Sequence, residues 1–441
     1  MGPPERGTGH LATQVDDRAG ASAPAEAERG RTGRLKVAYL MSRFPKLSET
    51  FVLSEILAVE ERGAEVELYP LLRTREDVVH PEALPLAARA RYEPFLSLPI
   101  LRSQLYFLRH RRRAYLGALG DLVRGTWGSL NYFVGALGIF PKVAHAARRM
   151  EADGVGHVHC HFSNHPAAAG FVVHRLTGLP YSFTAHGFDL HVDRRMLCEK
   201  ISEAAFVVPI SEYNRELIAA ECGTEVREKL AVIHCGVDTD LFRPSESAPP
   251  ERPFSLLCVG TLHEVKGQGY LVEACRLLVE EGVELVCTLL GDGPDREALA
   301  RGIAAAGLAG RVRIAGPRTR AEVAELLHAA HVLVAPSVPT REGKREGIPV
   351  VLMEAMASGV PVVASAISGI PELVEDGVTG LLVPPRDARA VADALRRLLD
   401  DAALRQKLGV AGREKVVREF DVRTNAAELV RRFRVQAGVP S

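Results

Sequence analysis

Several features that would indicate other protein classes are missing from this chain of 441 residues. Lysine and arginine number 55, as do aspartate and glutamate, so no basic excess points to nucleic acid as a partner. There is no run of about 18 consecutive apolar residues, and we expect no transmembrane helix. The beginning of the chain lacks an apolar run of about 7–15 residues behind a basic start, which argues against a secretory signal. These absences favour a globular protein of the cytoplasm.

Cysteine is sparse. The seven cysteines stand singly, several inside apolar runs, and none belongs to a CxxC pair or has a histidine at metal-ligand spacing. Cysteines in this pattern are typically buried and reduced. The sequence therefore predicts free thiols in a reducing compartment and no metal site.

The beginning of the chain differs in composition from the rest. Residues 1–33 are rich in glycine, alanine, proline and charge and contain no aromatic residue. Such a segment cannot bury enough apolar surface to offset the entropy of ordering, so we expect a disordered tail. The remaining length suits two domains at roughly 150 residues per domain.

From residue 35 onward, short apolar runs alternate with helical patterns, which is typical of parallel sheets covered by helices. The expected fold class is therefore α/β, with two doubly wound sheets. The expected organisation is an N-terminal domain at 34–236, a proline-rich linker at 237–253, a C-terminal domain at 254–405, and helices at 406–441 that could return to the first domain. Strands are expected in the first domain at 35–40, 65–72, 181–186, 206–211 and 230–235, and in the second at 254–260, 285–291, 312–316, 331–337, 360–365 and 380–385.

Ligands of doubly wound sheets bind beyond the carboxyl ends of the strands, and two such domains in series face each other across a cleft. The functional residues should therefore lie in the loops that follow the strands. Asp387, just before a helical pattern, is expected to cap that helix.

Residues 95–150 interrupt the alternation and predict an inserted pair of helices. They mix bulky apolar residues with a basic run at 109–113. One interpretation is an amphipathic surface that touches anionic lipid headgroups or a lipid-linked acceptor at the inner face of the plasma membrane. The other is a helical pair packed on the first domain with a solvated basic end.

The most informative segment is EGIPVVLMEAMASG at 346–359, which follows an expected strand and a loop. A helix should begin near Val350, because Pro349 suits the first turn. Its free N–H groups and positive dipole end, beside Gly347, suit a diphosphate. Glu346 and Glu354 could accept hydrogen bonds from sugar or ribose hydroxyls. The alternative is a surface helix with two solvated glutamates.

This segment resembles the E-x7-E signature of the retaining GT-B glycosyltransferases of group 1, in the form seen in exopolysaccharide and colanic-acid-type enzymes. Further stretches resemble the same family in the same order, so that the resemblance covers most of residues 35–400. These stretches are 42–56, 159–170, 183–190, 209–218, 232–244, 259–274, 291–299 and 368–385.

The resemblance implies the GT-B fold, with two Rossmann-like domains facing across a cleft. It also implies retaining transfer of a hexosyl-type sugar from a UDP- or GDP-sugar to a saccharide or lipid-linked acceptor, in exopolysaccharide or cell-surface glycan synthesis. The nucleotide sugar is a substrate, no cofactor is expected, and the resemblance implies a reaction that requires no metal.

The resemblance also assigns roles to catalytic candidates. Glu346 would contact the transferred sugar, Glu354 the ribose, Lys266 the leaving diphosphate, and His186 would lie near the sugar. Each has a simpler alternative, since an exposed lysine can be merely solvated and a lone histidine is more often structural.

The remaining candidates contact the donor or the acceptor. Donor-binding candidates besides Glu354 are Gly347, Ile348, Val350, Gly260, Thr261, Gly291, Gly316 and Arg318; acceptor candidates are Ser48, Glu49 and Asp189. Thr261 is a departure, because the family usually has an arginine there as a phosphate contact. Lys266 and backbone amides could suffice to bind the phosphates, helped by Arg318 or by a basic residue of the loop at 341–345. Gly291 is explained equally well by a tight turn.

Other functions stay open. A dinucleotide oxidoreductase would need GxGxxG after a strand, and neither 35–49 nor 254–269 contains it. An epimerase or a phosphorylase would share the two-domain layout. Two departures from the family, Thr261 and the lack of its paired glycines in the loop at 42–50, motivate the non-enzyme alternative, a degenerate protein that binds a nucleotide sugar or acts as a scaffold.

Overall fold

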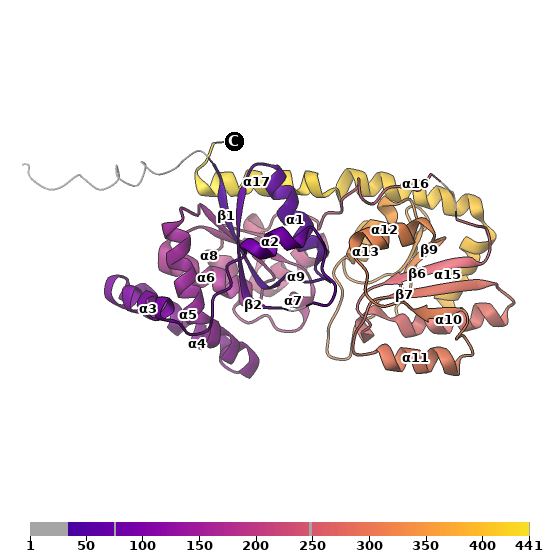
Figure 1. Cartoon of the computed structure of the whole chain (residues 1–441), viewed down its shortest axis with the longest axis horizontal. Helices are drawn as coiled ribbons and strands as arrows, with labels where there is room; N and C mark the ends of the chain where they lie inside the picture. The colour runs from indigo at the N-terminus through magenta and orange to yellow at the C-terminus, as the bar shows by residue number, and fades with distance from the viewer. Residues whose placement is uncertain (1–33, 75, 247–248, 441) are drawn as a thin grey trace, which may run out of the picture. The chain divides into compact units, whose positions relative to one another are not determined.

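A computed structural model describes residues 34–74, 76–246 and 249–440 of the chain (Figure 1). The tail expected at 1–33 lies outside these residues. Two parallel sheets organise the described part, as the alternation predicts. We call each sheet with its covering helices a lobe.

The first sheet has five parallel strands in the order β2-β1-β3-β4-β5. Its strands are β1 (Lys36–Phe44), β2 (Glu65–Arg73), β3 (His157–His161), β4 (Tyr181–Ala185) and β5 (Phe206–Pro209). The sequence predictions identified all of them except β3. Its sequence, HVHCH, alternates polar histidines with Val158 and Cys160, yet every residue of this strand is buried.

The prediction of a strand at 230–235 is wrong. Leu230 forms only a single bridge with Val207, and two further bonds run from the N–H groups of Ala231 and Ile233 to the carbonyls of β5. Pro209 at the end of β5 has no N–H to donate in return, so regular pairing cannot continue there.

Three helices occupy the insertion, where the sequence predicted two. They are α3 (Leu98–His110), α4 (Arg112–Thr126) and α5 (Leu130–Ala152), and α5 packs on α6 (His165–Thr177) (Figure 1). The basic run at 109–113 contains the junction of α3 and α4, where Arg111 stands between the two helices. Among the described residues, no helix combines the length and the apolar character needed to cross a bilayer.

The other helices of the first lobe are α1 (Thr50–Glu61), α2 (Ala83–Arg89), α7 (Phe188–His191), α8 (Leu197–Glu203) and α9 (Glu212–Cys222). Cys198 of α8 and Cys222 of α9 form a disulfide, so the prediction that all cysteines are free thiols is wrong for this pair. The two positions are 24 residues apart in a spacing that carries no motif, and only the packing of α8 beside α9 brings them together. The other five cysteines are free.

The second sheet has six parallel strands, as predicted, in the order β11-β10-β9-β6-β7-β8. Its strands are β6 (Phe254–Val259), β7 (Leu285–Leu290), β8 (Val312–Ile314), β9 (Val332–Ala335), β10 (Val362–Ser365) and β11 (Leu381–Val383). Its helices are α10 (Gln268–Glu280), α11 (Arg296–Ala305), α12 (Arg320–His328), α13 (Val350–Ala357), α14 (Ile370–Leu373), α15 (Ala388–Asp400) and α16 (Ala402–Glu419). The predicted cap is confirmed, because the Asp387 carboxylate accepts the Ala390 N–H at 2.8 Å.

The last helix, α17 (Val422–Ala437), lies against α1 of the first lobe, whereas α16 packs on α13 of the second (Figure 1). Phe433 of α17 is fully buried, and its ring contacts the rings of Tyr39, His157, His159 and Phe206. The C-terminal segment therefore links the lobes a second time, and it crosses beside the first connection, because the backbone of Val237 bonds to those of Phe420 and Val422.

Phe433→Ala should lower the free energy of unfolding by about 3–5 kcal/mol, because it leaves a cavity between α17 and the first sheet. Urea denaturation measures the change. Val435→Ala is the matched control: Val435 lies on the same helix with 64% of its surface exposed, and its loss should cost under about 0.5 kcal/mol. Equal effects of the two substitutions would show that α17 is not anchored through its buried face.

Candidate active site

A cavity of about 640 Å³ lies between the two lobes. Its walls come from the loops after β1, β4, β6 and β9 and from the start of α13, so it lies at the carboxyl ends of strands in both sheets, where the sequence placed the chemistry. Its volume falls within the range typical of small-molecule sites. We call this cavity the cleft.

Lys266 and Glu346 form an ion pair in the cleft wall. Lys266 Nζ lies 2.9 Å from Glu346 Oε2, and the two side chains are 21% and 17% exposed. Gly267 has φ +66°, and a Cβ there would collide with the Pro336 carbonyl oxygen, so the turn that presents Lys266 requires glycine. Partial burial strengthens the attraction beyond that of a surface pair.

Gly347 brings the lobes into backbone contact. A Cβ at this position would collide with the carbonyl oxygen of His186, and one at Gly187 would lie 3.0 Å from Gly347 Cα. The loop that carries Glu346 therefore lies directly against the end of β4. Gly347 has a packing role here in addition to any contact with a phosphate.

Helix α13 begins at Val350, as predicted, with Pro349 at its N-cap. Val350 and Val351 of its first turn line the cleft together with Ile348. The N–H groups at a helix start lack partners within the helix, and α13 therefore directs donors and a positive dipole end toward the cleft.

Glu354 lies one turn into α13, lines the cleft and is 7% exposed. Burial raises the pKa of its carboxyl to about 7, although the positive charge of Arg320 acts in the opposite direction. The prediction placed Glu354 about two turns along a helix and did not foresee its burial. A carboxyl in this environment is partly protonated near neutral pH.

Arg320 is a cleft residue that the sequence interpretation missed. It is 5% exposed, and its guanidinium lies 3.9 Å from Asp238. The sequence did contain a signal for its burial. Arg320 stands three residues before Val323 and seven before Leu327, both buried, and this spacing places it on the inward face of α12.

His186 lines the cleft at the end of β4 and is 8% exposed. Its ring centroid lies 4.5 Å from that of Phe51 and 4.7 Å from that of Phe162. Its Nε2 lies 3.1 Å from His161 Nδ1, and its Nδ1 lies 3.6 Å from Cys235 Sγ. Burial holds the pKa of His186 well below its ordinary value, so the ring is neutral.

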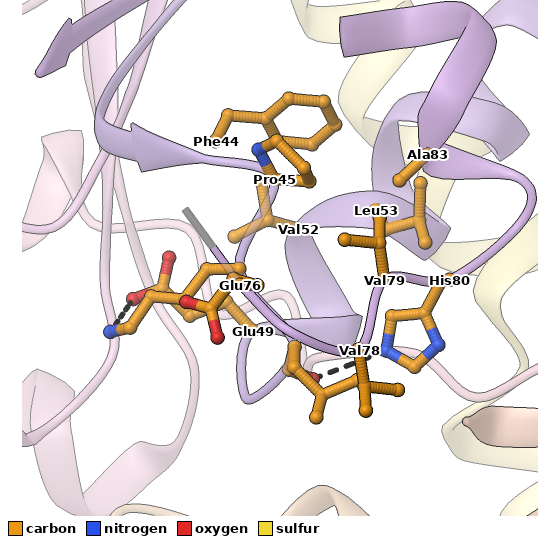
Figure 2. A pocket seen from close by; sticks show the side chains of 12 residues that line it. Phe44, Pro45, Glu49, Val52, Leu53, Glu76, Val78, Val79, His80 and Ala83 are labelled. Atoms are coloured by element: carbon orange, nitrogen blue, oxygen red, sulfur yellow. Dashed lines mark hydrogen bonds and ion pairs between the residues drawn. The ribbon is translucent and has the colours of Figure 1, made fainter. Parts of the chain in front are cut away.

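Ser48 and Glu49 line the cleft on the first lobe, where Glu49 pairs with Lys46 at 2.6 Å. Figure 2 shows Glu49 beside a small hollow in which Phe44, Val52 and Leu53 gather with a second segment that contains His80. His80 Nε2 lies 3.2 Å from the Leu47 carbonyl oxygen. Its Nδ1 accepts the Arg320 N–H at 3.3 Å, so this histidine joins the β1–α1 loop to α12 of the second lobe.

The cleft also contains Gly260, Thr261 and Arg318, which were expected to bind the donor. It does not contain Asp189, Gly291 or Gly316. The Asp189 carboxylate instead accepts the N–H groups of Ser163, His186 and Gly187 at 2.5, 3.0 and 2.9 Å, and so shapes the turn after β4. Gly291 and Gly316 bond to each other through their backbones.

Two family models match this chain. One, described as glycosyl transferases group 1, matches residues 253–401, and the other, glycosyltransferase family 4, matches residues 48–241. The amylovoran biosynthesis glycosyltransferase AmsK of Erwinia amylovora is 30% identical over 407 residues, which cover 88% of this chain and 96% of AmsK. The chain belongs to the group 1 glycosyltransferases.

Further comparisons agree with this family. A protein of Escherichia coli named as colanic acid biosynthesis glycosyltransferase WcaL is 34% identical over 420 residues, covering 90% of this chain and 98% of WcaL. The structure of Anabaena Alr3699/HepE in complex with UDP matches with a TM-score of 0.68 at 18% identity, covering 90% of this chain and 99% of that one. At that identity the likeness shows the fold, and it confirms the GT-B architecture of this glycosyltransferase.

The raised pKa of Glu354 should make the stability of the glycosyltransferase depend on pH. Because the folded protein favours the protonated carboxyl, this stabilisation is complete below about pH 4.5 and is lost as the pH rises to about 7. The free energy of unfolding of the wild type, minus that of Glu354→Gln, should fall by about 3 kcal/mol across this window. Urea titrations of both proteins at several pH values measure the difference, and a constant difference would mean that Glu354 is not buried as described.

Proposed function

We propose that this glycosyltransferase takes a sugar from a nucleotide-diphosphate donor held in the cleft, with retention of the anomeric configuration. The observation that supports it best is the Lys266–Glu346 pair, which lies in the same cavity wall as the start of α13. A cation and free N–H groups suit the diphosphate, while the neighbouring carboxylate suits the hydroxyls of the sugar.

In this proposal, charge that builds up on the departing phosphate is met by the Lys266 ammonium and the N–H groups of α13. Thr261 gives one neutral hydroxyl where the family usually has a guanidinium. Arg318 and Arg320, which reach the same cavity, are the cations that replace it. No metal ion is required, because these groups supply the positive charge.

Glu346 would orient the transferred sugar from the second lobe while His186 faces it from the first, and Glu354 would accept hydrogen bonds from the ribose hydroxyls. The acceptor hydroxyl attacks the anomeric carbon on the face from which the nucleotide departs. The new bond forms as the bond to the phosphate breaks, and a leaving-phosphate oxygen takes the hydroxyl proton. Holding both substrates between the lobes aligns them and excludes water.

The names of AmsK and WcaL support a role in exopolysaccharide synthesis. The acceptor that we propose for this role is a saccharide or a lipid-linked saccharide. UDP in the HepE structure makes a UDP-sugar the first donor to test, followed by GDP-sugars. A screen of both donor classes for slow hydrolysis, followed by incubation with lipid-linked saccharide extracts, would identify the substrates.

Lys266→Ala and Glu346→Ala should each lower transfer by roughly 10²–10³-fold, because each removes a group that acts on the reacting centre. Radiolabel transfer from the donor found in the screen measures the loss. Lys407→Ala, which removes an exposed lysine of α16, is the control and should leave transfer unchanged.

Near wild-type transfer by either cleft variant would remove that residue from the mechanism. If the protein is instead a scaffold, the wild type itself should transfer no sugar. This alternative requires that calorimetry detect donor binding while no acceptor extract supports transfer.

We further propose that the insertion contacts an anionic membrane surface, as suits a lipid-linked acceptor. Leu98, Leu101, Leu105 and Leu108 recur along α3 and are all exposed, whereas Ile100 and Phe107 face the lobe. Exposed arginines lie on α3, at Arg102 and Arg109, and at the start of α4, at Arg112 and Arg113. An apolar stripe flanked by arginine is typical of helices that lie in the plane of the headgroups.

Leu101→Glu combined with Leu105→Glu should weaken binding to phosphatidylglycerol vesicles by roughly 100-fold, because two leucines no longer enter the bilayer. Vesicle co-sedimentation measures the binding. Val410→Glu, an exposed position on α16, is the control and should bind like the wild type. If the wild type binds neither phosphatidylglycerol nor phosphatidylcholine vesicles, this surface does not touch membranes.

A further inference from the structure

Three histidines alternate along β3 and lie on one face of the sheet. His157, His159 and His161 have no exposed surface. His157 and His159 have neighbours on β4: Ser182 Oγ lies 2.7 Å from His157 Nε2 and 2.8 Å from His159 Nδ1, and Thr184 Oγ1 lies 3.0 Å from His159 Nε2. Both ring nitrogens of His159 therefore have partners, whereas His157 Nδ1 has none among the described residues. His161, the last of the three, has different partners.

One of these partners is the carboxylate of Glu55, a residue of α1 that contacts both His161 and Tyr39. Its Oε1 accepts the hydroxyl proton of Tyr39 at 3.0 Å and lies 3.3 Å from His161 Nε2. Burial acts to raise the pKa of Glu55, but the contacts of the carboxylate with His161, His159 and the Tyr39 hydroxyl hold this pKa below its ordinary value, so the side chain is an anion. No lysine or arginine in the described part of the chain forms an ion pair with it. An anion placed in this way favours proton donors around it.

Glu55, His161 and His186 form a row of neighbouring polar groups. The positions of the protons along this row follow from the negative charge of Glu55. Among the described residues His161 Nε2 is buried and makes no aligned hydrogen bond, but it lies 3.3 Å from the carboxylate oxygen Glu55 Oε1. The negative charge of Glu55 favours a proton on the nitrogen that faces it, and a proton on Nε2 leaves Nδ1 as the acceptor. His161 Nδ1 lies 3.1 Å from His186 Nε2 while the ring centroids are 5.3 Å apart, so the rings meet through their edges. His186 Nε2 must then donate, which leaves its Nδ1 as an acceptor.

His186 Nδ1 is at the end of this row, beside Cys235 Sγ at 3.6 Å, and both residues line the cleft. Phe51 and Phe162 pack against the imidazole and hold its orientation. We infer that Glu55 and His161 are positioning residues, which fix His186 in one tautomer so that Nδ1 accepts a hydrogen bond from a substrate hydroxyl. The effect on catalysis rests on the proposed sugar transfer, whereas the tautomer of His186 follows from the contacts alone.

A metal ion is the competing explanation. Ligand atoms of Glu55, His159 and His161 lie within 4.8 Å of one another. Both ring nitrogens of His159 already have hydroxyl partners on β4, however, whereas a ligand nitrogen must present a free lone pair. The hydrogen-bond row therefore accounts for these contacts more completely.

Nitrogen NMR of the full chain labelled with ¹⁵N-histidine tests the tautomers directly, without any substrate. Among the 15 histidines, spectra of His161→Gln and His186→Gln identify the two resonance pairs. At about pH 7.5 the His186 ring should be neutral and protonated at Nε2, and the His161 spectrum should show a proton on Nε2. A wild-type His186 protonated at Nδ1 would overturn the inference, as would one equivalent of zinc bound by the purified protein and lost in His161→Gln.

Variants at Glu55 test the cause. In Glu55→Leu the row loses its acceptor, and the His186 signals should leave the Nε2-protonated pattern; Glu55→Gln retains an acceptor oxygen and should restore it. Ser182→Ala alters the partners of His157 and His159 alone and should leave His186 unchanged. An unchanged His186 in Glu55→Leu would mean that Glu55 does not set its tautomer.

The same variants separate positioning from binding. With the donor found in the screen, kcat of Glu55→Leu should fall on the order of 10²-fold with little change in KM, and Glu55→Gln should recover most of the loss. A change in KM alone would contradict a role in positioning. If the wild type transfers no sugar, the proposed function fails while the NMR result still decides the inference.

Discussion

A backbone contact without side chains determines how the two sheets of this glycosyltransferase meet. Gly347 lies so close to the His186 carbonyl that any side chain would collide with it, and Gly187 faces Gly347 in turn. This contact places Glu346, from the second lobe, next to the end of β4 in the first. The cleft, its opposed carboxylate and imidazole, and the entry to α13 all depend on this approach.

Burial then decides the chemistry of the groups that surround the cleft. It raises the pKa of Glu354 to about 7 and keeps His186 neutral, whereas Lys266 and Glu346 remain partly exposed and pair with each other. Arg320 adds a buried cation from α12. The cleft therefore combines cations and free N–H groups on the second lobe with the neutral imidazole of His186 on the first, an arrangement that suits an anionic leaving group joined to a neutral sugar.

The sequence predicted the α/β fold, six strands of the second sheet and four of the first, because their apolar runs are long and bounded by turns. It missed β3, where histidines give a buried strand a polar appearance. E-x7-E and Lys266 could be found because motif spacing carries them. Arg320 and His80 lie outside the stretches that resemble the family. Glu55 and His161 lie within such stretches, but their roles depend on contacts between distant segments that no motif shows. Asp189 was expected at the acceptor, but it supports the backbone of the turn after β4.

The proposed function requires that a nucleotide diphosphate bind between Lys266 and the start of α13. A crystal structure with bound UDP or GDP tests it most directly. We expect phosphate oxygens within hydrogen-bonding distance of Lys266 Nζ and of the N–H groups of Val350 or Val351, with Glu354 facing the ribose. A nucleotide bound elsewhere, or phosphates that leave Lys266 without contact, would contradict the account.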